Sequence, residues 1–262
     1  MHLVQIERYP LKSCKAQPLE SAYLGQLGIE GDRQLILAEL DGRFITARTE
    51  PALLQVELES IDNGWIAKHP RLASTRIIRQ ERSSYASVDV WGRRIRAPRI
   101  EQAEAWFSEL LGREVYLLHN TEEASDQADK RYPWGPIFSD GYPLLVCNTA
   151  SLDALNIAAN GLFEMARFRA NLVISTDRPW AEDDWQLLRI GDTLLRRRKP
   201  CERCVLVTRD PETGEKDPAQ QPLRTLAKIH HGVQGEILFG QNFSVEKAGS
   251  LKLGDKVELL SN

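Results

Sequence analysis

The segment LLRIGDTLL, from Leu187 to Leu195, places a Gly-Asp pair between two aliphatic runs. A similar pattern, SLKLGDKVEL, recurs from Ser250 to Leu259. Each pattern is typical of a strand, a tight turn and a second strand, because glycine and aspartate favour turns while aliphatic residues favour strands. Two such turns also arise by chance in a β-rich protein. The repeat therefore indicates a β-rich C-terminal part and does not by itself define a function.

Short β-type runs continue through the rest of the chain. They lie at His2–Glu7, Gln34–Glu39, Arg43–Arg48, Leu54–Leu58, Trp65–Lys68, Arg76–Arg79, Ala86–Trp91, Arg93–Ala97, Val115–Leu118 and Leu144–Cys147. Many short strands with few helices favour barrels or sandwiches over a doubly wound sheet. We therefore predict a mainly β fold with a few helices.

Two helices and a long loop interrupt these strands. Glu101–Leu111 carries apolar residues at the spacing of one helix face. Ser151–Asn160 reads as a second helix, with Asn148 or Thr149 as its N-terminal cap. Residues 120–135 are polar and show no periodicity, so we predict a long loop there. We place the boundary between two domains, 1–119 and 120–262, at the start of this loop.

The composition is that of an ordinary soluble globular protein, because 42% of the 262 residues are hydrophobic and 27% are charged. A net charge of −3 gives no indication of a nucleic-acid or membrane surface. No apolar run approaches the ~20 residues that span a bilayer, and the N-terminus lacks a secretory signal pattern. Four cysteines do not make a disulfide framework in a chain of this size. We therefore expect a cytoplasmic protein with reduced thiols.

A pair of thiols follows the first Gly-Asp pattern, in the stretch RRKPCERCVLVT at residues 197–208. The cations of this stretch favour the thiolate over the neutral thiol, and the thiolate is the reactive form of cysteine. Cys201 and Cys204 are therefore the first candidates for chemistry.

Four interpretations of this Cys-x-x-Cys pair remain open. A zinc site normally needs a second pair of ligands at similar spacing, which the sequence lacks. A thioredoxin-like pair opens a helix, whereas the Val-Leu-Val-Thr run at 205–208 reads as a strand. The plainest reading is two small buried residues, since free cysteine packs as a small hydrophobe. The fourth is a bond from one thiolate to a transition metal carried by a cofactor.

Anion-binding side chains occur on several predicted turns. Lys12 and Ser13 follow the first strand, and Arg33 ends a glycine-rich segment. In Arg167–Arg169 both guanidinium groups would lie on one side of an extended segment, because side chains alternate along a strand. Arginine is suited to bidentate phosphate contacts, although each such residue alone is more often a solvated surface charge. Their combination with a cationic Cys-x-x-Cys pair favours a cofactor site.

Seven motifs occur in a fixed order along nearly the whole chain. They are YPLKS (9–13), GIEGDR (28–33), FITAR (44–48), DGYP (140–143), RFRAN (167–171), PCERC (200–204) and FGQN (239–242). In this order they resemble MOSC proteins, which take their name from the C-terminal domain of molybdenum cofactor sulfurase. Similar members of that family include bacterial proteins that detoxify N-hydroxylated base analogues and the mitochondrial amidoxime-reducing component.

The resemblance implies an N-terminal β-barrel-like domain over 1–119, packed on a C-terminal MOSC β-barrel over 120–262 whose sheet the N-terminal strands can join. A pyranopterin molybdenum cofactor would lie between the two. In relatives the second cysteine of Pro-Cys-x-x-Cys binds molybdenum, which points to Cys204 as the metal ligand and catalytic residue. The residues that we assign in this way to the pterin and its phosphate are Lys12, Ser13, Arg33, Asp140, Thr149, Arg169 and Asn171.

The same resemblance implies a molybdenum-dependent oxidoreductase that reduces small N-hydroxylated substrates. One departure is Ala170, which replaces a usual proline between Arg169 and Asn171 without removing a contact group. A second is that the cysteine spacing predicts no iron–sulfur cluster in this chain, so electrons would come from a separate donor such as a ferredoxin-like protein. Two alternatives stay open: a sulfur carrier with a persulfide on Cys201 or Cys204, and a cofactor-binding module without turnover.

Overall fold

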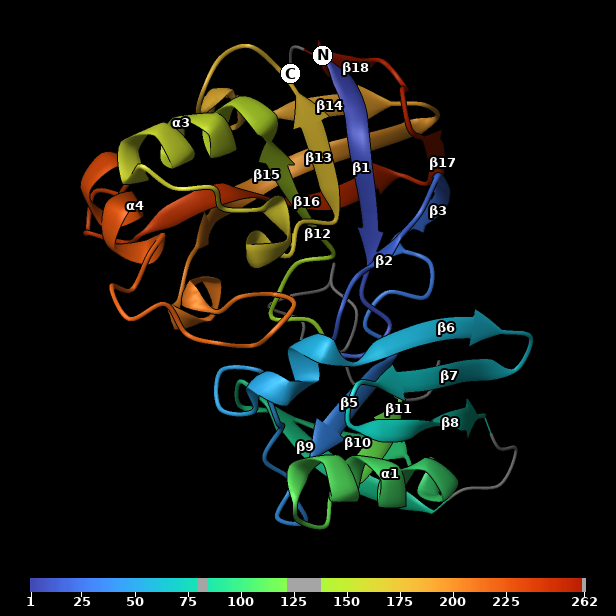
Figure 1. Cartoon of the computed structure of the whole chain (residues 1–262). Helices are drawn as coiled ribbons and strands as arrows, with labels where there is room; N and C mark the ends of the chain where they lie inside the picture. Colours follow the sequence, from blue (N-terminus) through green and yellow to red (C-terminus); the bar gives the residue numbers. More distant parts are fainter. Residues whose placement is uncertain (80–83, 122–137, 261–262) are drawn as a thin grey trace.

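The computed structural model describes residues 1–79, 84–121 and 138–260, which form two lobes (Figure 1). The terminal lobe holds the N-terminal strands and the C-terminal part of the chain, and the central lobe holds residues 35–79 and 84–119. Both lobes are mainly β, which confirms the predicted fold class. Most of the loop predicted at 120–135 lies outside the described residues.

An eight-stranded sheet is the largest part of the terminal lobe. Its strands, in sheet order, are β18 (Val257–Leu260), β14 (Leu187–Ile190), β15 (Thr193–Glu202), β16 (Leu238–Lys247), β12 (Leu144–Asn148), β13 (Leu172–Ser175), β1 (His2–Arg8) and β2 (Gln17–Pro18). All neighbours are antiparallel except β12 and β13. A bridge between His2 and Lys256 brings the start of β1 beside β18. The sheet therefore curls on itself, with an N-terminal strand beside strands of the C-terminal part.

The two Gly-Asp patterns form strands, as the sequence predicts. The first makes the hairpin of β14 and β15, with Gly191 in the left-handed region at φ 54. The second gives β17 (Gly249–Lys252) and β18, which lie in different sheets. There β17 pairs with β3 (Ser21–Gly25), and β3 pairs with β4 (Gly28–Ile29). The pattern thus fixes the strands, while their partners depend on the surrounding sheet.

Two helices pack together on one side of the large sheet, namely α3 (Thr149–Ala159) and α4 (Leu223–Ile229) (Figure 1). The side chain of Asn148 accepts a hydrogen bond from the Ala150 amide at 3.0 Å, so Asn148 is one of the two caps that the sequence predicts. The segment before β13 forms a short 3-10 helix, η2 (Met165–Phe168), and another, η3 (Ala181–Asp183), precedes β14.

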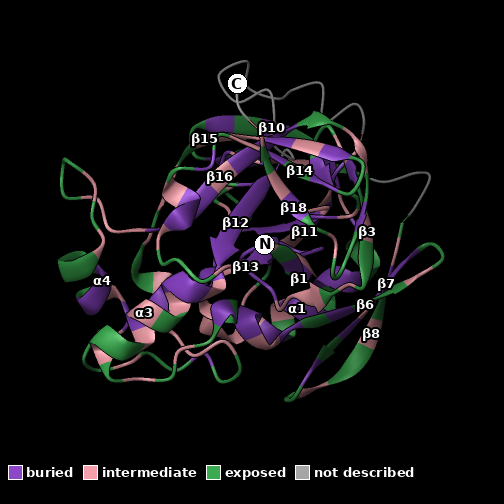
Figure 2. Cartoon of the chain, turned by 90° about the horizontal axis from the view of Figure 1, so that it is seen from above, coloured by how far each residue is buried: buried purple, intermediate pink, exposed green. Residues whose placement is uncertain are grey.

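In its described residues, the central lobe has three small sheets and one α-helix. The pairs are β5 (Leu35–Ala38) with β11 (Tyr116–His119), β9 (Tyr85–Val90) with β10 (Arg93–Pro98), and the triple β6 (Glu57–Ile61), β7 (Gly64–His69) and β8 (Leu72–Ile78). Helix α1 (Glu101–Leu111) packs on β8 and β11 and has the bounds that the sequence predicts. Its buried Trp106 and Phe107 join the core of this lobe. Figure 2 colours the chain by burial, and strands β12 and β13 of the large sheet are buried there.

Short 3-10 helices occupy all or part of two segments predicted as strands. The first, η1 (Pro51–Gln55), overlaps the predicted strand because proline fixes a helical φ at its first position. The second, η4 (Val205–Thr208), replaces the strand predicted after the cysteines. The Thr208 hydroxyl donates to the Val205 carbonyl at 2.7 Å and so closes a helical turn. From sequence alone, the β-branched residues of this run indicate a strand instead.

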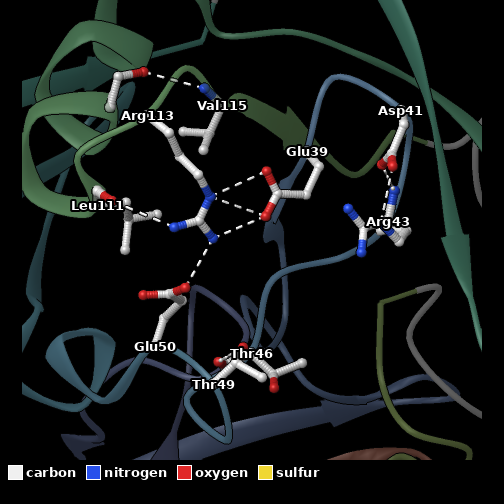
Figure 3. A network of polar contacts seen from close by, with 10 residues as sticks. Glu39, Asp41, Arg43, Thr46, Thr49, Glu50, Leu111, Arg113 and Val115 are labelled. Carbon is white, nitrogen blue, oxygen red and sulfur yellow. Dashed lines mark hydrogen bonds and ion pairs between the residues drawn. The ribbon is translucent and has the colours of Figure 1, made fainter.

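Arg113 joins three segments of the central lobe (Figure 3). Its guanidinium donates to the Glu39 carboxylate at 2.8–3.1 Å and to Glu50 at 2.8 Å. We expect Arg113→Ala to lower the free energy of unfolding by about 1 kcal/mol, since these charged hydrogen bonds are partly screened by solvent. Arg43→Ala breaks an exposed pair with Asp41 and should leave unfolding by urea nearly unchanged. Equal losses in the two variants would contradict a stabilising role for Arg113.

His230 follows α4, and both nitrogens of its ring form hydrogen bonds. Nδ1 lies 3.0 Å from the Leu238 carbonyl, Nε2 lies 2.7 Å from Asp183 Oδ2, and the ring stacks on Trp180. Burial would lower the pKa of His230, but the Asp183 carboxylate and the Leu238 carbonyl raise it above its ordinary value. A raised folded-state pKa stabilises the fold below the unfolded value of about 6.5. That stabilisation is lost as the pH rises through the folded pKa.

Asp183→Asn is therefore expected to destabilise the protein more at pH 6 than at pH 9, by on the order of 1 kcal/mol at the lower pH. The neighbouring carboxylate Glu182 also faces His230 and is kept in both proteins. Differential scanning calorimetry at the two pH values measures the effect. Asp184→Asn, at an exposed ion pair with Arg178, is the control. A loss of stability in Asp183→Asn that is the same at both pH values would sink the prediction.

Candidate functional site

A cavity of about 310 Å³ opens between the two lobes. Both lobes contribute to its walls, with Thr46 and Arg48 coming from the central lobe. Seven of the predicted site residues line it: Lys12, Ser13, Arg33, Asp140, Arg169, Asn171 and Cys204. The fold thus gathers residues from distant parts of the sequence around one space.

The two cysteines of the Cys-x-x-Cys pair lie in different surroundings, although both line the cavity. Cys201 lies near the end of β15 and is partly buried, and its Sγ accepts a hydrogen bond from Arg203 Nη1 at 2.9 Å. Cys204 precedes the first residue of η4 and is exposed. The reading of both as small buried residues is therefore wrong for Cys204. Of the two, Cys204 is the thiol that is open to a ligand in the cavity.

Two further contacts hold Arg203 in the wall of the cavity. Its Nη2 donates to the Phe168 carbonyl at 2.8 Å, and its guanidinium lies 5.5 Å from the centre of the Phe168 ring. Burial would lower the pKa of Arg203, but the nearby sulfur atoms of Cys201 and Cys147 raise it above its ordinary value. The guanidinium therefore stays charged, and it places fixed positive charge beside both thiols of the pair.

Lys12 and Asp140 form an ion pair at the cavity wall. Lys12 is 7% exposed, and its Nζ donates to Asp140 Oδ1 at 2.6 Å and to the Phe138 carbonyl at 2.9 Å. The indole N–H of Trp91 donates to the same Asp140 oxygen at 2.8 Å. Desolvation would raise the pKa of Asp140, but the charge of Lys12 and these hydrogen bonds hold it well below its ordinary value. Asp140 is therefore an ionised acceptor across the physiological pH range.

The two arginines of Arg167–Arg169 point to different places, which corrects the prediction that they lie on one side. The segment is not extended: Arg167 belongs to η2, and Arg169 has a left-handed backbone at φ 55. Arg167 Nη1 donates to the Arg209 carbonyl at 2.6 Å, and Nη2 pairs with Asp210 at 3.1 Å. Only Arg169 lines the cavity. The helical turn separates side chains that alternation in a strand would have aligned.

The Asn171 side chain joins the cavity wall to the eight-stranded sheet. Its side-chain carbonyl accepts from the Leu145 amide at 3.2 Å, and its side-chain nitrogen donates to the Glu7 carbonyl at 3.1 Å. The same nitrogen lies 3.4 Å from Asp32 Oδ2. The Asn171 amide is thus engaged with β1, β12 and the Asp32 carboxylate, and it holds these parts of the wall together.

Thr149 is the predicted cofactor residue that the structure does not bring to the cavity. Among the described residues it is the first of α3, behind the Asn148 cap, and it is absent from the cavity lining. Lys199 and Arg203, two of the cations predicted beside the thiols, line the cavity as well. Several other lining residues were not predicted, among them Thr46, Arg48, Tyr142 and Asn242. These four lie within the seven sequence motifs, so the motif boundaries themselves were the available signal.

The cavity is suited to an anionic ligand that also carries a soft metal. Positive side chains of Lys12, Arg33, Arg169 and Arg203 surround it. Lys12 pairs with Asp140, and Arg33 pairs with Asp32. Guanidinium groups bind phosphate through charge-assisted hydrogen bonds. A thiolate such as that of Cys204 prefers soft transition metals. Phosphate-binding cations and one open sulfur therefore face the same space.

Comparison with known proteins gives the chain a family. Residues 1–114 match the MOSC N-terminal beta barrel domain, and residues 136–258 match the MOSC domain. Within the described residues, no helix is long and apolar enough to cross a membrane.

Three relatives align over most of this chain. Mitochondrial amidoxime reducing component 2 of Macaca fascicularis is 32% identical over 95% of this chain and 80% of its own length. The Homo sapiens protein of that name is 31% identical over the same shares. Mitochondrial amidoxime-reducing component 1 of Homo sapiens is 31% identical over 98% of this chain and 82% of its own length. The chain therefore belongs to the MOSC-domain protein family that includes the mitochondrial amidoxime-reducing components.

Proposed function

We propose that this protein is a molybdenum-cofactor-dependent oxidoreductase that reduces N-hydroxylated compounds. The observation that carries the proposal is the exposed Cys204 thiol in a cavity lined by cations from distant parts of the chain. The names of the relatives, which are amidoxime-reducing components, support the substrate class. The proposed location is the cytoplasm, and the proposed electron source is a separate ferredoxin-like protein.

The residues of the cavity fit a pyranopterin molybdenum cofactor. Cys204 would hold the metal, because a thiolate is a soft ligand. Arg33 and Arg169 would bind the phosphate, since neither is closed off from the cavity. When bound, the molybdenum would supply the two electrons that break the N–O bond of the substrate. With two protons, the substrate would give water and the product that carries N–H in place of N–OH, such as an amidine from an amidoxime.

Asp140 would orient the substrate in this reaction. Its side chain is 71% exposed, and its lowered pKa keeps it ionised, so it accepts hydrogen bonds and does not donate a proton. Lys12 and Trp91 fix one of its oxygens in place. The remaining acceptor sites of the carboxylate suit an N–H or O–H group of an N-hydroxylated substrate.

The proposal is tested by turnover with an artificial electron donor. Protein from a molybdopterin-competent host should reduce an aromatic amidoxime to the amidine with a reduced viologen dye, and protein from a host without the cofactor should not. The amidine product is measured by chromatography. Protein that contains molybdenum yet forms no amidine would overturn the assignment as a reductase.

A sulfur carrier is the second candidate, because the exposed Cys204 beside the charged Arg203 would also suit a persulfide. It predicts a removable extra sulfur on Cys204 in protein that holds no cofactor. Intact mass spectrometry before and after reduction separates the two candidates. A cofactor-binding module without turnover would hold molybdenum and fail the amidoxime assay.

A further inference from the structure

Tyr9 contacts two of the arginines that line the cavity, Arg33 and Arg169. It is 2% exposed and follows β1. Its hydroxyl donates to the Ala170 carbonyl at 3.1 Å, and its amide donates to Asp32 Oδ1 at 2.7 Å. These contacts fix the position of the aromatic ring. Burial raises the pKa of Tyr9, so its ring stays a neutral phenol.

Two guanidinium groups pack on this single ring. The Arg33 guanidinium carbon lies 4.5 Å from the ring centre, and that of Arg169 lies 4.3 Å from it. Both distances are within the range of attraction between a cation and the electron-rich face of an aromatic ring. Such attraction is strongest where water is excluded, as it is around the buried Tyr9. The ring therefore holds two like charges near each other.

The Tyr9 ring supports Arg169. Within the described residues, no carboxylate lies within ion-pair distance of its guanidinium, whereas Arg33 pairs with Asp32. An arginine that stacks on a ring keeps its N–H groups free in the plane of the guanidinium. Those of Arg169 stay available to an anion in the cavity that it lines.

The backbones of both arginines depend on the same neighbourhood. Arg33 and Arg169 have φ of 45 and 55, in the left-handed region that residues with a β-carbon rarely adopt. The Arg33 amide donates to the Tyr9 carbonyl at 2.8 Å, and the Tyr9 hydroxyl binds the residue after Arg169. Tyr9 thus contacts both unusual turns and both side chains.

We propose that Tyr9 is a positioning residue, whose buried ring holds Arg33 and Arg169 in the cavity so that together they bind a phosphate group. The inference rests on the proposed function, because the phosphate is that of the proposed cofactor. It adds a residue that does not line the cavity, and it assigns the ring face, rather than the hydroxyl, as the group that matters.

The test uses full-length, cofactor-free protein and inorganic phosphate, with binding measured by isothermal titration calorimetry. Tyr9→Phe should bind phosphate within about twofold of wild type, because the ring face is retained. Replacement of Tyr9 by pentafluorophenylalanine keeps the shape of the ring but withdraws electrons from its face. It should weaken phosphate binding roughly threefold to thirtyfold relative to Tyr9→Phe. Difluorophenylalanine should give an intermediate loss.

Tyr23, which is 51% exposed on β3, is the matched control. Pentafluorophenylalanine at position 23 should leave phosphate binding unchanged. The proposal would be overturned if all variants at position 9 bound phosphate with equal affinity, or if the wild type bound no phosphate. It would also be overturned if the substitution at position 23 weakened binding as much as the one at position 9. A loss in Tyr9→Phe as large as in the fluorinated variant would assign the effect to the hydroxyl and also overturn it.

This outcome is separable from that of the proposed function, because phosphate binding is measured without molybdenum. A phosphate series as expected, combined with no reduction of amidoxime by loaded protein, would overturn the reductase and leave Tyr9 as a positioning residue. Molybdenum content in the competent host gives a second readout. The molybdenum content should be highest in Tyr9→Phe, lower in the difluorophenylalanine variant and lowest in the pentafluorophenylalanine variant.

Discussion

Cys204→Ser is expected to abolish molybdenum binding and with it the reduction of N-hydroxylated compounds. Serine keeps the size of the side chain but replaces a soft sulfur by a hard oxygen, which is a poor ligand for a metal held by sulfur. Turnover of an aromatic amidoxime should fall on the order of 10³-fold or more, which is ~4 kcal/mol of barrier. Molybdenum per protein, measured by inductively coupled plasma mass spectrometry, should fall in parallel.

Cys201→Ser is the matched control for this substitution. Cys201 is bound to Arg203 and is partly buried, so its sulfur is not the open ligand. This variant should keep most of its molybdenum, because the serine oxygen can still accept the hydrogen bond from Arg203. Equal molybdenum in wild type and Cys204→Ser, or loss of molybdenum only in Cys201→Ser, would show that Cys204 is not the ligand.

Asp32→Ala is expected to have the largest effect on stability. Asp32 is 2% exposed, and it accepts from the Tyr9 amide and pairs with the Arg33 guanidinium. Its removal leaves a buried amide and a largely buried cation without their partner, which costs about 3–5 kcal/mol. The melting temperature should fall by roughly 10 °C in a protein of this size.

Asp41→Ala provides the comparison for Asp32→Ala, since Asp41 forms an exposed ion pair with Arg43. Its melting temperature should match that of wild type. Circular dichroism during heating measures both variants. A melting temperature for Asp32→Ala within about a degree of wild type would contradict the role of Asp32 as the buried partner of Arg33.

Elements that depend on near neighbours could be predicted from the sequence. The bounds of α1 follow from its apolar spacing and from Gly112, whose φ of 69 ends the helix. The hairpin of β14 and β15 follows from the Gly-Asp turn between two aliphatic runs. In both, the deciding residues lie within a few positions of one another, so the local pattern carries the information.

Elements that depend on distant partners could not be predicted. Arg167 and Arg169 diverge because one binds Asp210 and the other packs on Tyr9, and neither partner is near in the sequence. The run Val205–Thr208 has strand-forming residues, yet it turns because Thr208 bonds back to the Val205 carbonyl. Residue type alone does not reveal such contacts.

A cofactor site that combines cations with the Cys-x-x-Cys pair could be predicted from the residues, whereas the role of each residue in it could be predicted only through the family resemblance. The motif residues Lys12, Arg33, Arg169 and Cys204 do meet in one space, whereas the cap position Thr149 does not. Tyr9 stands in a quoted motif, but its role depends on two ring contacts that only the fold creates. The division of the chain at residue 119 stays a prediction.

X-ray absorption at the molybdenum edge tests the central claim most directly, namely that Cys204 and a pyranopterin together bind the metal. Two sulfurs would come from the pterin and one from Cys204, so protein loaded in a competent host should show three sulfur neighbours per molybdenum. Two sulfur neighbours in the native protein, or no molybdenum at all in a host that makes the cofactor, would contradict the claim.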